Sequence, residues 1–252
     1  MDLGVDAVQV VTFVLASVRI IAFLMVAPPF AGNAVPIRIK AGLSFVLALV
    51  ITPRMAGTIE SIDAAALIAG VVYQAVMGLA LGFIVLMLFS AVQSAGSLID
   101  FSVGFSSAAI FDPFAGTGLS PMARLYQMLA TLLLFSTGGY LLFIGGLMRS
   151  FEAAPMSGFD IGRIGSVLTD GLGNFFVAAL QIGLPVLAAL FMAELLLGLM
   201  AKAAPQMNML IIGFSMKSLI LLGLGGLALP LLPRAIEMIV DMSLEGMSAI
   251  AG

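Results

Sequence analysis

The sequence lacks two residue types that carry much of protein chemistry, because its 252 residues include no cysteine and no histidine. Without cysteine there is no disulfide bond, no thiolate nucleophile and no cysteine-held iron–sulfur cluster. Without histidine the commonest general base and metal ligand is missing. A serine–histidine membrane protease and a zinc site built on histidine or cysteine are therefore excluded, and we predict no metal and no cofactor.

Charge is also scarce, at 9% of residues with a formal net charge of -3, so the chain offers no basic surface for nucleic acid or for anionic lipid. Hydrophobic residues make up 62%, which predicts an all-α integral membrane protein with about five to seven apolar segments in one unit. The N-terminus carries Asp2 and Asp6 where a signal peptide would carry Lys or Arg, so we expect it to be retained.

The apolar segments have unusual lengths. They lie at 7–30, 39–52, 64–98, 122–148, 171–201 and 207–232, followed by an amphipathic tail. As helices, the second would reach about 21 Å and the third about 52 Å, against about 30 Å of hydrocarbon. The long segment is expected to tilt, kink near Gly78 and Gly82, or leave the bilayer, unless both are ordinary spans with other boundaries. Lys and Arg residues flank the apolar segments at both ends, so they do not predict which side of the membrane each loop faces.

Ionisable side chains inside the apolar segments need partners, and these are Arg19, Glu194 and Lys217. Glu194 and Lys217 are about equally far from a predicted turn, so an antiparallel hairpin would bring them together as a buried charge pair. Exchanging the two charges is then expected to rescue the defect that either single change causes. A proton relay through Glu194 remains the alternative interpretation. The turn residues are Pro205, Gln206 and Asn208.

Small residues predict close helix contacts, within the chain or with partner subunits. The candidate packing positions are Gly78 and Gly82, and the repeated pairs Gly138, Gly139 and Gly145, Gly146.

The stretch 104–121 joins two apolar segments but is itself rich in apolar side chains, which is unusual for a loop. Asp112 and Pro113 would fix its turn, the first by an Asx-type hydrogen bond and the second by its locked φ. The glycines that would shape it are Gly104, Gly116 and Gly118.

Several motifs in order along the chain resemble the FliR family of flagellar and type III secretion export proteins. They are APPFAGNAVPIRIKAGL (27–43), YQAVMGLALGF (73–83), AGSLIDFSVGFSSAAIFDP (95–113), SPMARLYQMLATLLLF (120–135) and LPVLAALFMAELLLGLMAKAAPQMNMLIIGFSMK (184–217). The most specific parts are VPxRxK, the AG…D…GFS…DP stretch and APQMNxxxIGFxxK.

The resemblance implies a structural subunit without enzymatic activity, in the bacterial inner membrane and the flagellar basal body. Its implied partners are FliP and FliQ, with FlhB, FlhA and basal-body ring and rod proteins, and unfolded export substrates pass through the assembly. A FliP-like part would span 1–170 and contain the 104–121 loop. A FliQ-like helical hairpin with the amphipathic tail would span 171–252.

The resemblance also implies that the 104–121 loop projects into the export channel as part of a plug. Packing alone remains the other interpretation of its apolar side chains. The residues implied for the plug are Ile110, Phe111 and Phe114, flanked by Phe105, Leu119 and Met122.

Three alternatives stay open at this point: the equivalent subunit of a virulence injectisome, a secondary transporter and an intramembrane enzyme. A transporter of the repeat type would show two similar halves, and an intramembrane aspartyl enzyme would show paired carboxylates. Neither pattern is found in the sequence.

Overall fold

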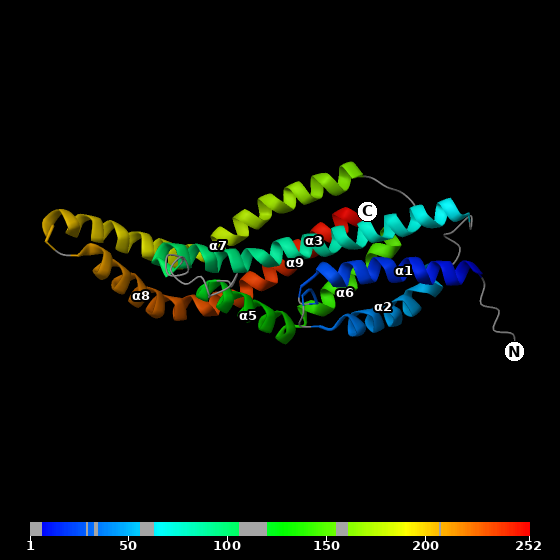
Figure 1. Cartoon of the computed structure of the whole chain (residues 1–252), viewed down its shortest axis with the longest axis horizontal. Coiled ribbons are helices and arrows are strands. Elements are labelled where there is room, and N and C mark those ends of the chain that lie inside the picture. Colours follow the sequence, from blue (N-terminus) through cyan, green and yellow to red (C-terminus); the bar gives the residue numbers. More distant parts are fainter. Residues whose placement is uncertain are drawn as a thin grey trace. The chain divides into compact units, whose positions relative to one another are not determined.

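The computed structural model is almost entirely helical in the part it describes, which is residues 7–28, 30–32, 35–55, 63–105, 120–154, 161–206 and 208–252 (Figure 1). No strand occurs among these residues, and the predicted all-α membrane class is confirmed. The helices are α1 (Ala7–Val26), α2 (Ile37–Ile51), η1 (Thr52–Met55), α3 (Ala64–Val103), α5 (Pro121–Ser136), α6 (Gly139–Ala153), α7 (Ile161–Ala203), α8 (Met209–Ala228), η2 (Leu229–Leu231) and α9 (Leu232–Ala251).

Three of the described helices are long and apolar enough to cross a membrane, namely α1, α3 and the Gly162–Ala203 part of α7. The number rises to five if α5 with α6, and Ile211–Gly226 with Leu229–Ala251, each count as one broken span.

Helix lengths depart from a simple span in both directions. With 40 residues α3 is about 60 Å long and with 43 residues α7 is about 65 Å long, whereas the 15 residues of α2 reach only about 22 Å. The long segment is a single helix, α3, which continues through Gly78 and Gly82.

The chain divides into two compact units, and α3, α7 and α9 contribute residues to both. The first unit comprises Met1–Leu88, Thr137–Gly173 and Val240–Gly252. In it α2 lies along α1 (Figure 1), where the rings of Phe13 and Phe45 meet edge to face at 5.1 Å. The Ser44 hydroxyl donates to the Ser17 carbonyl at 2.9 Å.

The second unit comprises Phe89–Ser136 and Asn174–Ile239. Its core includes three buried alanines, Ala91 on α3 with Ala178 and Ala179 on α7, against which Phe175 and Met238 pack. Small side chains at these positions let α3 and α7 approach closely. The predicted FliP-like and FliQ-like parts are a different division of the chain and stay a prediction.

Candidate functional site

The ends of the predicted plug loop lie in the second unit and are described, whereas its middle is not. Phe105 and Met122 belong to the described residues, as do Gly104, Ser120 and Pro121. The other predicted plug and loop-shaping positions lie outside them: Ile110, Phe111, Phe114, Leu119, Asp112, Pro113, Gly116 and Gly118.

At the first end of the loop, α3 stops at a glycine. The Gly104 N–H donates to the Asp100 carbonyl at 3.0 Å, and Gly104 has a φ of +103°. Residues with a side chain rarely adopt this left-handed region, and glycine there is a common way to end a helix. Beyond it the ring of Phe105 meets that of Phe214 on α8 edge to face, with centroids 5.8 Å apart.

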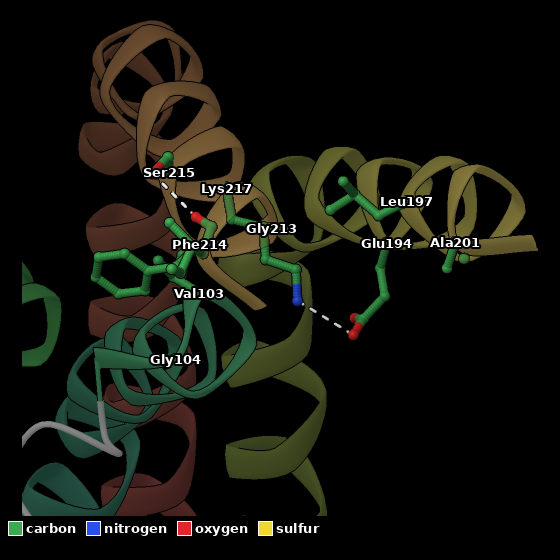
Figure 2. A pocket seen from close by; sticks show the side chains of 11 residues that line it. Val103, Gly104, Glu194, Leu197, Ala201, Gly213, Phe214, Ser215 and Lys217 are labelled. Carbon is green, nitrogen blue, oxygen red and sulfur yellow. Dashed lines mark hydrogen bonds and ion pairs between the residues drawn. The ribbon is translucent and has the colours of Figure 1, made fainter. Parts of the chain in front are cut away.

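Lys217 of α8 connects the end of α3 to α7. Its Nζ donates to the Ser102 carbonyl at 3.1 Å and lies 3.1 Å from the Glu194 carboxylate (Figure 2). The Ser102 carbonyl belongs to the last turn of α3, where the helix dipole favours a cation. The two charges predicted to pair are therefore in contact. Their burial differs, because the Lys217 side chain is 14% exposed whereas that of Glu194 is 63% exposed.

A cavity of about 660 Å³ opens beside this ion pair. Figure 2 shows Val103 and Gly104 at the end of α3 on one side, with Leu197 and Ala201 of α7 and Phe214 of α8 around it. Its wall is mainly apolar, with Glu194 and Lys217 as the charged groups among the described residues that line it.

At the second end of the loop, a carboxylate of α3 binds the start of α5. Asp100 Oδ2 accepts hydrogen bonds from the backbone N–H groups of Met122 at 2.9 Å and Ala123 at 3.1 Å. Asp100 is fully buried. One turn earlier on α3, a Cβ on Gly96 would lie 2.6 Å from the Ala123 Cα, so only glycine allows this approach. The two backbones are in direct contact there.

The predicted hairpin turn lies where the sequence placed it, between the end of α7 at Ala203 and the start of α8 at Met209. Pro205 and Gln206 form an exposed turn. Asn208 precedes α8 in the N-cap position, and its carbonyl accepts from the Ile212 N–H at 3.2 Å.

A sequence model of the bacterial export proteins, family 1, matches residues 10–243. The chain belongs to this family, the FliR family. Curated relatives named "Flagellar biosynthetic protein FliR" are similar to it. Those of Pectobacterium carotovorum and Bacillus subtilis are each 31% identical, over 69% and 71% of this chain and 67% and 71% of the relative. That of Escherichia coli is 29% identical, over 68% of this chain and 66% of the relative.

The FliR-family motifs fall on the contacts just described. The AG…D stretch supplies Gly96 and Asp100, and IGFxxK supplies Phe214 and Lys217. In VPxRxK, the Lys40 ammonium donates to the Gly32 carbonyl at 3.2 Å and so ties the segment before α2 to that helix. Each motif thus contributes a contact between elements.

The glycines predicted to pack have different surroundings in the first unit. A Cβ on Gly78 would lie 2.2 Å from the Arg19 carbonyl oxygen, and one on Gly82 would lie 3.0 Å from that of Phe23, so α3 and α1 touch there. Gly139 is buried, and a Cβ on Gly146 would meet Met247 and Leu244 of α9 at 3.1–3.2 Å.

Gly138 and Gly145 are less crowded, since added Cβ atoms there would meet no described atom within 4 Å. Gly138 instead has a φ of +74° and separates α5 from α6.

Arg19, which the sequence left without a partner, is held by neutral groups of α3 and α6. Its Nε donates to Gln74 Oε1 at 2.6 Å, and its guanidinium donates to the carbonyls of Ser150 and Ala154 at 2.9 Å each. The guanidinium also lies 4.3 Å from the centre of the Phe151 ring. Because Ser150 lies in the last turn of α6 and Ala154 is its C-cap residue, the buried cation compensates the negative end of that helix.

Sequence reasoning missed the roles of Gly96, Asp100 and Ser102. Asp100 follows the predicted apolar segment at 64–98, so it was not counted among the ionisable side chains that need a partner. Its partners are backbone N–H groups, which the side-chain pattern does not reveal. Among the described residues no group of three or more acidic side chains could hold a metal ion.

Proposed function

We propose that this chain is a structural subunit of the flagellar type III protein export gate in the bacterial inner membrane, without enzymatic activity. With FliP and FliQ it would form the channel through which unfolded flagellar subunits are exported, in contact with FlhB, FlhA and the ring and rod proteins of the basal body. Family membership over residues 10–243 carries the proposal. The names of the relatives favour the flagellar form over a virulence injectisome.

The contacts at the ends of the 104–121 loop support a channel role. Phe105 is held on α8, and the start of α5 is held on α3, so both ends of the loop have fixed attachments in the second unit. In this proposal the apolar side chains between them, Ile110, Phe111 and Phe114, close the pore by dewetting and yield to a passing chain.

Complementation and copurification test the proposal. In a flagellated host that lacks its own copy, the tagged chain should restore secretion of hook and filament subunits. It should also purify with FliP and FliQ. As a control, the same tagged chain is expressed without FliP and FliQ and should give little stable protein, because its apolar surfaces lack their partners.

Either of two results would refute the assignment. One is a chain that is stable and monodisperse alone and fails to bind FliP and FliQ. The other is normal flagellar secretion in its absence. Restored secretion of virulence effectors instead of flagellar subunits would move the assignment to the injectisome.

A further inference from the structure

The start of α5 is capped by a residue of another helix. A helix leaves its first N–H groups without intrahelical partners. In α5 the first residue, Pro121, has no N–H, and the next two N–H groups, of Met122 and Ala123, both donate to Asp100 Oδ2. The local N-cap position is occupied by Ser120, a residue type well suited to capping, yet the carboxylate comes from α3.

Placing a carboxylate at this position is costly for stability. Asp100 is fully buried, and its Oδ1 has no hydrogen-bond partner among the described residues. A buried carboxylate oxygen without a donor is unfavourable, whereas a cap from Ser120 would bury no charge. Capping alone therefore does not explain why the acid is on α3.

Gly96 is a second observation that indicates a close contact between α3 and the start of α5. It lies one turn before Asp100 on the same face of α3, and its missing side chain lets the backbone of α3 touch that of Ala123. One residue thus permits the close approach, and the other fixes it with two charge-assisted hydrogen bonds.

We infer that Asp100 is a positioning residue that fixes the start of α5 to α3 and thereby sets the separation of residues 105 and 120. The link to export rests on the proposed function, since those residues flank the segment that carries the predicted plug. The contact itself does not depend on that function and can be measured separately.

The competing explanation is that Asp100 merely caps α5, and Ser120→Asp distinguishes the two. An aspartate at position 120 would cap α5 from within its own chain segment. In an Asp100→Ala background it should restore the thermal stability lost with the cap, but it cannot restore a link to α3.

The absence of cysteine makes the link measurable in the full chain, because spin labels attach only to introduced cysteines. Suitable exposed positions are Phe101 on α3 and Leu132 on α5. In the complex with FliP and FliQ, Asp100→Ala should broaden the distance distribution between the labels and reduce secretion about tenfold or more. Adding Ser120→Asp should recover the unfolding temperature but leave the distances broad and secretion low.

Two controls keep the result interpretable. Asp170→Ala removes an exposed carboxylate within α7 and should change neither readout. Asp100→Asn keeps the size of the side chain and one acceptor oxygen, so this variant should fold even if Asp100→Ala does not. It should broaden the distance distribution between the labels less than Asp100→Ala does.

The inference is overturned if Ser120→Asp restores both the narrow distances and secretion, or if Asp100→Ala leaves the distances unchanged. Broad distances with normal secretion would leave the attachment standing and would instead contradict the proposed role of the loop in export.

Discussion

At the scale of single residues, Lys217 has two partners of unequal weight. The Ser102 carbonyl lies in the last turn of α3, whereas the Glu194 carboxylate is 63% exposed. Where the exposed partner is in contact with water, such an ion pair contributes little, about 0–1 kcal/mol. The lysine therefore acts mainly on the end of α3, and the carboxylate is its secondary partner.

We expect Lys217→Met to lower the apparent unfolding temperature of the detergent-solubilised chain clearly, and Glu194→Gln to change it little. Exchanging the charges, Glu194→Lys with Lys217→Glu, should not restore stability, which revises the expectation from the sequence, because the new carboxylate would face the negative end of α3. Thermal unfolding of the four proteins, wild type included, measures this. Full recovery in the swapped variant would mean that the ion pair dominates after all.

The plug residues can be tested by their effect on small ions. Replacing Ile110, Phe111 and Phe114 together with serine should leave the complex assembled but raise the ion conductance of membranes that contain it, because the closure would no longer exclude water. Phe101→Ser, an exchange of the same kind on an exposed position of α3, is the control. Unchanged conductance would favour the packing interpretation of the loop.

The sequence located some residue contacts and missed others for a definite reason. Glu194 and Lys217 could be brought together because a recognisable turn lies midway between them. Arg19 and Asp100 could not be assigned partners, because each binds backbone groups of elements far along the chain. Backbone donors and acceptors are the same for every residue type, so composition gives no sign of them.

At the scale of elements, α3 and α1 of the first unit approach each other closely at Gly78. A Cβ at position 78 would meet both the Arg19 carbonyl and Ala22 Cβ, the latter at 2.8 Å. Backbone atoms cannot rotate away as the end of a side chain can. Any larger residue there must push the helices apart.

Gly78→Ala should therefore destabilise the chain by about 1–3 kcal/mol despite the better helix propensity of alanine. Gly145→Ala is the matched control, since a Cβ there meets no described atom within 4 Å and should be neutral or slightly stabilising. Thermal unfolding in detergent measures both variants. Equal unfolding temperatures for the two would show that α1 and α3 are not in contact at Gly78.

Most helices were predictable from the apolar runs, but α7 begins at Ile161, well before its run at 171–201, and one break was not predicted. The apolar run at 122–148 forms two helices, α5 and α6, because the chain turns at Gly138 in the left-handed region. A pair of glycines in an apolar run is compatible with helix packing and with a break, although Ser136 and Thr137 before it are weaker helix formers than leucine. Only the backbone conformation distinguishes the two.

At the scale of the whole molecule, tilt alone cannot keep α3 within hydrocarbon. A helix of about 60 Å would need a tilt of roughly 60° to fit a layer of about 30 Å, and observed tilts reach about 40°. Part of this apolar helix must therefore lie outside the hydrocarbon. There it needs a protein covering, which agrees with a role as a subunit of an assembly.

The two long helices, α3 and α7, differ in how much of their surface is buried within the chain. In the most apolar window of α3, 67% of residues are buried within the chain, against 28% for α7. The exposed face of α7 must be covered by lipid or by other subunits. Composition established the membrane class, but it could not predict that α3, α7 and α9 each enter both units, because that depends on contacts between distant segments.

The cap that α3 provides to α5 has a consequence for how such a chain can evolve. Neither attachment uses a side chain from residues 106–119, so an insertion between Phe105 and Ser120 leaves the groups that form both attachments unchanged. Doubling a loop costs only about 0.6 kcal/mol in closure entropy. Mutations that alter these two attachments and insertions between them are therefore separate steps in the evolution of such a chain.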